Sequence, residues 1–75
     1  MKRYAAYHID GSKANEFREA AVKLFSNEEL KREIQERMMN LNRETMSFDL
    51  RVGPGCPKEI EELAKRFGKG YNSYA

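Results

Sequence analysis

The chain has 75 residues, of which 40% are hydrophobic and 35% charged, and its formal net charge is +2. This length fits one domain, so we treat residues 1–75 as a single small globular domain, and the hydrophobic content argues against a disordered chain. One cysteine excludes an intramolecular disulfide framework and a cysteine-rich zinc site. No apolar run is long enough to span a membrane or to form a signal peptide. We therefore expect a cytoplasmic protein, of a cell or of an infected host cell, with no membrane partner.

The first predicted element is a strand at residues 2–10, whose side chains alternate between two faces. One face carries Ala5, Tyr7 and Ile9, and the other carries Tyr4, Ala6 and His8. A turn follows, and Ser12 is then in position to cap a helix of about three turns. The apolar stripe of this helix consists of Ala14, Phe17, Ala21, Leu24 and Phe25.

A second helix is predicted to begin at Ser26. Ser26 and Glu29 have the spacing of a capping box, and Phe25 and Leu30 have the spacing of a hydrophobic staple around the same cap. The apolar stripe consists of Leu30, Ile34, Met38 and Leu41. This periodicity predicts a helix that runs to about residue 40 or 42.

The second half of the chain predicts a strand and a third helix. Apolar residues alternate with polar ones over residues 46–52, which is typical of a strand with one buried face. A Gly-Pro-Gly loop ends it, and Cys56 and Pro57 then suit the cap and the first position of a helix. Its stripe consists of Ile60, Leu63, Ala64 and Phe67, and Gly68 suits the residue just after its end. Residues 69–75 have no period, and we expect a mobile tail unless Tyr71 or Tyr74 docks on the rest of the domain.

The predicted fold is therefore α+β, with a small two-stranded, antiparallel sheet packed under three helices in the order β-α-α-β-α. Two strands alone make a weak sheet, and both of their edges are templates for another chain. In a chain this short, the free energy gained by burying apolar surface is also only about as large as the entropic cost of ordering the chain. These two constraints favour a homodimer that extends the sheet, unless the tail or the segment around residues 42–45 covers the edges instead.

Few residues are candidates for catalysis. Cys56 at a helix N-terminus would have a stabilised thiolate and a lowered pKa, but the second cysteine of a dithiol motif is absent. His8 has Asp10 on the same strand face, and it forms a Cys–His dyad only if the fold brings Cys56 to it. The sequence has no metal-ligand spacing and no phosphate-binding glycine fingerprint. We therefore predict no enzyme activity, no metal site and no cofactor.

Nucleic-acid binding is the alternative function. Residues 1–25 carry five basic and three acidic side chains, residues 26–44 four and five, and residues 45–75 five and four, so no segment is a basic block. Folding can still gather positive charge beside tyrosines that stack on bases. The residues that would bind nucleic acid are Lys2, Arg3, Tyr4 and Arg51, in a small dimeric regulator.

The leading hypothesis is a non-enzymatic protein-interaction module: an inhibitor, adaptor or regulatory protein that binds a larger, unknown protein and blocks its surface. Small chains of this character are frequent among accessory proteins of phages and mobile elements, which is an association and not a derivation. The predicted contact residues are Tyr4, Ala6 and His8 on the outer strand face, with Glu29, Arg32, Glu33 and Glu36 on the second helix.

Overall fold

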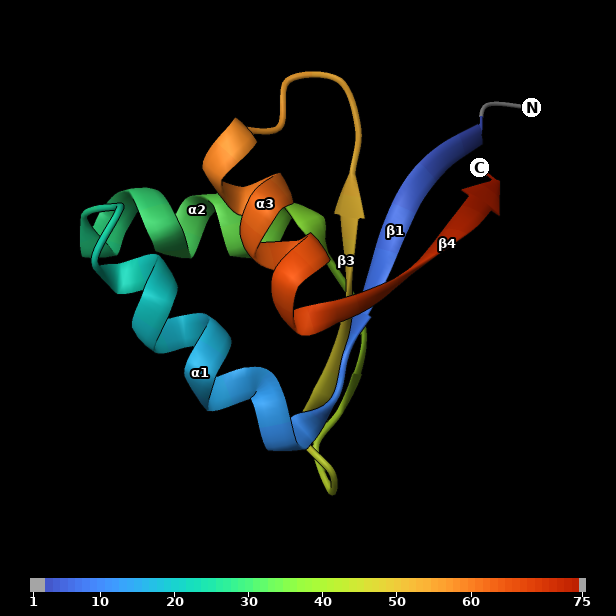
Figure 1. Cartoon of the computed structure of the whole chain (residues 1–75), viewed down its shortest axis with the longest axis horizontal. Helices are drawn as coiled ribbons and strands as arrows, with labels where there is room; N and C mark the ends of the chain where they lie inside the picture. Colours follow the sequence, from blue (N-terminus) through green and yellow to red (C-terminus); the bar gives the residue numbers. More distant parts are fainter. Residues whose placement is uncertain (1–2, 75) are drawn as a thin grey trace.

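The structure is an α+β arrangement of three helices and a four-stranded sheet (Figure 1). The computed structural model describes residues 3–74, and of these the side chains of residues 4–72. The strands are β1 (Arg3–Ile9), β2 (Met38–Asn42), β3 (Ser47–Val52) and β4 (Gly68–Tyr74). The helices are α1 (Gly11–Val22), α2 (Asn27–Arg37) and α3 (Lys58–Phe67). The predicted α+β class and the three helices are confirmed.

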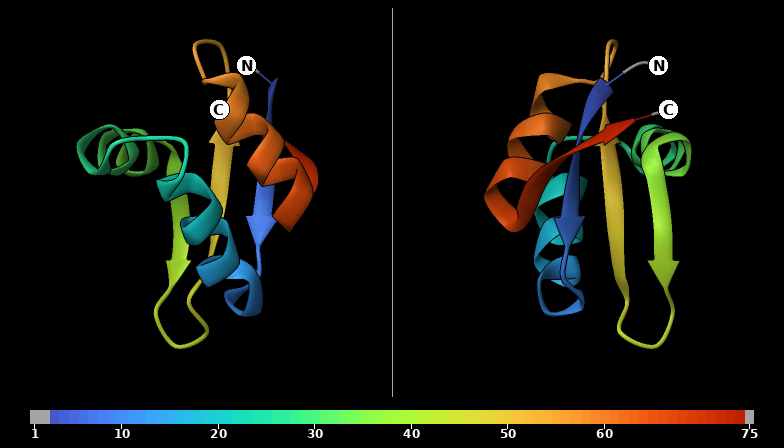
Figure 2. Two further views of the ribbon diagram at one scale, coloured as in Figure 1. Left: turned by 60° about the vertical axis from the view of Figure 1, so that its left-hand side comes forward. Right: turned by 90° about the vertical axis from the view of Figure 1, so that its right-hand side faces the viewer.

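The sheet has the strand order β2-β3-β1-β4, and every neighbouring pair is antiparallel. Helices connect β1 to β2 and β3 to β4, and each connection skips one strand. This is the connectivity of two interleaved split β-α-β units, the ferredoxin-like arrangement, with one additional helix in the first connection. All three helices lie against the same face of the sheet, and the right-hand view of Figure 2 looks onto the other face, which no helix covers.

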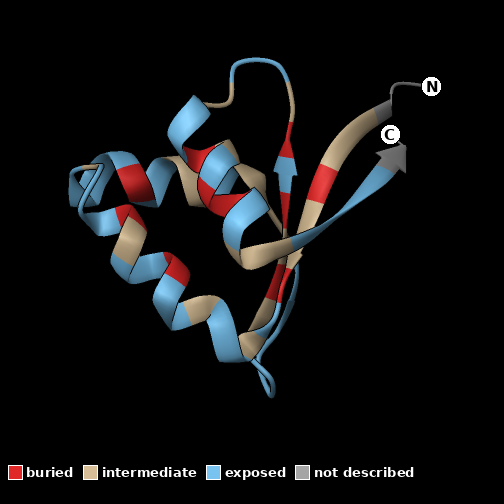
Figure 3. Ribbon diagram, viewed as in Figure 1, coloured by how far each residue is buried: buried red, intermediate tan, exposed pale blue. Residues whose placement is uncertain are grey.

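The core lies between the helices and the sheet, where the inward faces of β1 and β3 meet the apolar stripes (Figure 3). Ile9, Leu50 and Ile60 are fully buried and come from β1, β3 and α3. Phe17 of α1 makes edge-to-face contacts with the ring of Phe48 at 5.9 Å and with the ring of Phe67 at 6.4 Å. The prediction that Tyr7 and Ile9 share one face of β1 is confirmed, because both pack on this core.

The predicted two-stranded sheet is wrong, because the chain supplies two further strands itself. The segment that we expected to be a mobile tail continues directly from α3 as β4, and its backbone pairs with β1 from Arg3↔Tyr74 to Ile9↔Gly68. The periodicity contained no signal for this strand, since it is the edge of the sheet and its sequence is rich in glycine and polar residues. Both edges of β1 are therefore covered by this chain. The homodimer that would extend the sheet stays a prediction.

The second helix ends at Arg37, several residues earlier than its apolar stripe predicts. Met38 and Met39 pair with Leu50 and Asp49, and a bulge follows before Asn42. Asn40 within this bulge has a φ of 53°, a left-handed conformation that asparagine tolerates better than most residues. Pairing with β3 thus outweighs a local pattern that is compatible with helix, and the segment becomes β2.

The helix starts agree with the sequence only in part. The predicted cap at Ser26 is confirmed, since its hydroxyl accepts a hydrogen bond from the Glu29 amide at 3.3 Å. The first helix begins two residues earlier than predicted, with Asp10 rather than Ser12 at the N-cap position. Pro57 rather than Cys56 is the N-cap residue of α3.

Gly68 directly follows α3, as predicted, but a left-handed backbone is not the reason for a glycine there. Its φ is −121°, which any residue adopts. A Cβ atom at this position would lie 2.6 Å from Cδ1 of Ile9 and 2.8 Å from the carbonyl oxygen of Ala64. The close approach of α3 and β1 at the first residue of β4 therefore leaves no room for a side chain.

We predict that Gly68→Ala lowers the free energy of unfolding by roughly 1–3 kcal/mol, the usual cost of overpacking a core. Urea denaturation followed by circular dichroism measures this change. Gly53→Ala is the matched control, because a Cβ there meets nothing within 4 Å and the expected change is within about 0.5 kcal/mol. Equal stability of the two variants would contradict the close packing at the α3–β4 junction.

Candidate functional site

One side of the sheet is covered by no helix (Figure 2). The strand register places polar and aromatic side chains on this side, and we call it the open sheet face. Its members project from all four strands and lie beside one another through the strand register. They are Tyr4, Ala6 and His8 of β1, Asn40 of β2, Asp49 and Arg51 of β3, and Lys69 and Tyr71 of β4.

Asp49 is the centre of this face, because its carboxylate binds one residue from each of the other three strands. Its Oδ1 atom lies 2.7 Å from Nδ1 of His8. Its Oδ2 atom accepts hydrogen bonds from Nδ2 of Asn40 at 2.9 Å and from the hydroxyl of Tyr71 at 2.7 Å. The side chain of Asp49 is only 13% exposed, so these contacts replace most of its water. One carboxylate therefore joins β1, β2 and β4 to β3 across the face.

These contacts shift the protonation equilibria of the cluster. Partial burial alone would raise the pKa of Asp49, but hydrogen bonds from Asn40, His8 and Tyr71 together hold that pKa below its ordinary value of 3.8. Burial, with the hydrogen bond to Asp49, raises the pKa of Tyr71 to about 12. At neutral pH the carboxylate is therefore ionised and the phenol is protonated, which is the state in which they form their hydrogen bond.

His8 lies between two carboxylates. Besides the contact of Nδ1 with Asp49, its Nε2 atom is 3.2 Å from Oδ1 of Asp10. Only the imidazolium form carries a proton on both nitrogens and can donate to both carboxylates. The hydrogen bond to Asp49 is the main cause of the raised pKa of His8, while partial burial acts in the opposite direction.

The aromatic part of the face lies toward the other end of β1. The Arg51 guanidinium carbon lies 5.2 Å from the centroid of the Tyr4 ring, a cation–π contact. Ala6 lies between Arg51 and Tyr71 in the register and is completely buried. The small side chain of Ala6 thus forms a floor between larger neighbours, and Tyr71 remains 39% exposed.

The structure brings some of the predicted contact residues together and separates others. Tyr4, Ala6 and His8 share the open sheet face, and Arg51 from the nucleic-acid alternative joins them. The other predicted contact residues, on the charged face of the second helix, are Glu29, Arg32, Glu33 and Glu36. They belong to α2, which packs on the opposite side of the sheet, so the two sets do not form one surface. Glu33 is moreover ion-paired with Arg37 of its own helix.

Two residues of the nucleic-acid alternative fall partly or wholly outside the described structure. Lys2 lies outside the described residues, and only the backbone of Arg3 is described, where it pairs with Tyr74. The alternative therefore rests on Tyr4 and Arg51.

Sequence reasoning missed the residues that organise the face. Asp49 was visible as a polar member of the alternating strand, but its role depends on which strand lies beside it. The sequence predicts a tail for Lys69 and Tyr71 that is mobile unless Tyr71 or Tyr74 docks, and it predicts a helix for Asn40. Strand register is what places these residues around Asp49, and no local pattern in the sequence contains it.

The thiol of Cys56 does not have the lowered pKa that its place before a predicted helix suggests. Burial raises the pKa of Cys56 above its ordinary value of 9.0, although the positive charge of Arg37 acts in the opposite direction. The expected lowering by the start of a helix is therefore wrong. Cys56 lies in the loop after β3, whereas His8 is near the far end of β1, where it pairs with Asp49. No three metal-binding side chains cluster within the part of the chain that the structure describes.

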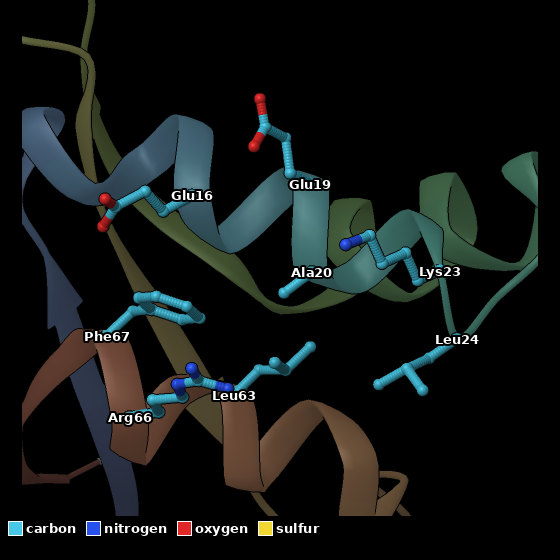
Figure 4. A pocket seen from close by; sticks show the side chains of 8 residues that line it. All are labelled: Glu16, Glu19, Ala20, Lys23, Leu24, Leu63, Arg66 and Phe67. Carbon is cyan, nitrogen blue, oxygen red and sulfur yellow. The ribbon is translucent and has the colours of Figure 1, made fainter.

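Two of the hollows in the part of the chain that the structure describes lie on its helix side. One is a shallow cleft between α1 and α3, and its charged residues are Glu16, Glu19, Lys23 and Arg66 (Figure 4). Two acidic and two basic side chains line it, so it favours neither sign of charge. The other, between α1, α2 and β2, is predominantly apolar and is described below.

Comparisons of the chain with protein-family models, with curated proteins and with solved structures gave no match. Within residues 3–74, none of the helices has the length and apolar character to cross a lipid bilayer. The geometry of the surface is therefore the basis for a functional proposal.

We predict that the pKa of His8 in the folded protein lies above 6.5 and falls toward that value in Asp49→Asn, because the amide no longer supplies a charged acceptor. NMR titration of the imidazole protons measures both values. Asp10→Asn is the matched control and is expected to lower the pKa less, since Asp10 contributes less to the shift.

The same shift predicts the direction of the pH dependence of stability. A pKa raised on folding stabilises the protein fully below the unfolded pKa, and this contribution is lost as pH rises through the folded pKa. Wild-type protein should therefore lose more unfolding free energy between about pH 6 and about pH 8 than Asp49→Asn does. An unchanged His8 pKa in Asp49→Asn would contradict the network.

Proposed function

We propose that this chain is a non-enzymatic protein-binding module, and that it contacts its partner through the open sheet face. The single observation that carries the proposal is the cluster around Asp49 and Arg51, which presents two tyrosines and an arginine on a sheet surface that no helix covers. An inhibitor, adaptor or regulatory protein that blocks a surface of a larger protein fits this arrangement.

The composition of the face supports a protein partner. Tyrosine and arginine are the residues most enriched at the energetic centres of protein interfaces, where they supply large contact areas and polar tips. The polar groups around Asp49 already satisfy one another, so covering them costs less than covering unpaired groups. The sheet also holds these side chains in place, which lowers the entropy lost on binding.

The charges of the face favour a protein over nucleic acid. Among the described side chains, its basic residues are Arg51, Lys69 and His8, and the carboxylates of Asp49 and Asp10 lie 2.7 and 3.2 Å from the ring nitrogens of His8. Binding to nucleic acid draws most of its affinity from cations that replace counterions on phosphates, and a face with balanced charge supplies few of them. The contact between Tyr4 and Arg51 is the specific observation that keeps single-stranded nucleic acid as a second candidate.

The chemistry of Arg51 defines the partner further. Its guanidinium stacks on Tyr4 and is exposed to solvent, which leaves N–H groups available at its edge. A carboxylate accepts two parallel hydrogen bonds from such a group. The partner surface is therefore one that presents an aspartate or glutamate beside apolar side chains that cover the exposed ring of Tyr71.

A photocrosslinker in place of Tyr71 tests this proposal in extract from the source cells. We predict one discrete protein adduct, which unlabelled wild-type protein prevents and unlabelled Arg51→Glu does not, because charge reversal removes the carboxylate contact. The same crosslinker in place of Glu62, an exposed residue of α3 on the other side of the sheet, is the matched control and should not form that adduct.

Two results would reject the proposal. One is an adduct that forms equally from both crosslinker positions. The other is retention of the protein on oligothymidylate or oligouridylate that weakens steeply between about 50 mM and about 200 mM salt and is lost in Arg51→Glu, which would establish the nucleic-acid alternative. Sedimentation of the free protein decides the homodimer separately.

A further inference from the structure

An apolar groove runs between α1, α2 and β2 on the helix side of the sheet, with a volume of about 580 Å³. Core residues form its floor, among them Phe17, Leu30 and Phe48. Ile34 and Met38, both partly buried, continue the apolar surface toward β2. The groove is therefore an opening in the layer that covers the core, where α1 and α2 diverge (Figure 1).

Exposed apolar side chains gather along this groove. Val22, Leu41 and Met46 line it and are 45%, 44% and 53% exposed. They are three of the five large hydrophobic residues that are exposed among the described side chains. Exposed apolar residues are ordinary when they are scattered, but a group beside a hollow that reaches the core is typical of an interaction site.

The charged residues of the groove have one sign. Arg18 of α1 and Lys31 of α2 are the charged side chains among its described lining residues, and both are exposed. Neither forms an ion pair with another described side chain. The groove thus combines an apolar floor with a cation on each of its two helical walls.

We propose that this groove binds an amphipathic helix of a partner protein, with its apolar stripe on the floor and carboxylates beside Arg18 and Lys31. Helices of 12 and 11 residues form the walls, so the groove is roughly three helical turns long. The backbone groups of both walls are used within their own helices, which leaves side-chain packing as the means of recognition. That is the mode in which a helix binds in a groove.

The openness of the groove decides against a small amphiphile such as a fatty acid. Sites for small ligands cover most of the ligand surface, whereas the wall residues here remain about half exposed. A helix that lies along α1 reaches from Met46, whose backbone is beside Gly11 at the start of α1, to Val22 at its end. This site lies on the opposite side of the sheet from the open sheet face and does not depend on the proposed function of that face.

A stapled helical peptide of about three turns, with leucines at i, i+3, i+4 and i+7 and glutamates elsewhere, is the probe. A second peptide has lysines in place of the glutamates. We expect the glutamate peptide to bind about fivefold more tightly to the wild-type protein, as two exposed charge pairs allow. In two-dimensional NMR spectra it should shift the amide signals of α1, α2 and β2, and leave those of Tyr4, His8 and Tyr71 unchanged.

Charge reversal of the groove supplies the decisive comparison. Arg18→Glu combined with Lys31→Glu should reverse the preference, so that the lysine peptide binds more tightly. Arg32→Glu combined with Lys58→Glu makes the same change in net charge outside the groove, and should leave the preference unchanged. The same spectra report whether each variant is folded.

Several outcomes would overturn the proposal. Equal affinity for both peptides, or shifts outside the groove, would remove the charge-selective helix site. Shifts of groove residues by palmitate while neither peptide binds would assign the groove to a small amphiphile. Concentration-dependent shifts of the same residues in the free protein would assign it to a second copy of this chain.

Discussion

Strand β1 is the constraint around which this fold is built, because it is paired along both of its edges. Its backbone pairs with β3 on one side and with β4 on the other, and Ile9 near its end is fully buried against the helices. Unpaired backbone groups at this position would have to be covered by another chain. The last strand therefore completes the sheet from within the same chain and brings Tyr71 and Lys69 beside Ala6 and His8.

Asp49 connects the strands through side chains on the open sheet face, as β1 connects them through its backbone. Its carboxylate receives hydrogen bonds from His8, Asn40 and Tyr71, which come from the three other strands. Such a cluster connects the positions of side chains that are far apart in the sequence, and it makes the open sheet face sensitive to the protonation of one histidine. The face is thereby ordered before any partner is present, which is the property that a binding surface requires.

The two proposed contact surfaces follow from the layered architecture. One side of the sheet has no helices and is polar and aromatic, whereas the other is covered by helices that leave an apolar groove. The open sheet face presents rigid side chains on strands, and the groove presents an accessible part of the core between α1 and α2. The two proposals together would place partners on opposite sides of the sheet, an arrangement expected of an adaptor more than of a simple blocking protein.

Local patterns in the sequence determined most of the secondary structure and one face of the site. The 3.6-residue and two-residue periods located three helices and two strands, and they placed Tyr4, Ala6 and His8 on one face. The spacing of Ser26 and Glu29 located the helix cap. All of these features depend on neighbours along the chain. Tertiary structure alone decided β2, β4 and the cluster around Asp49. Met38–Asn42 became a strand because β3 offered backbone partners, and Gly68–Tyr74 because β1 did. Pairing between distant segments has no local period, so the residues that join the four strands became visible only when the strands were aligned.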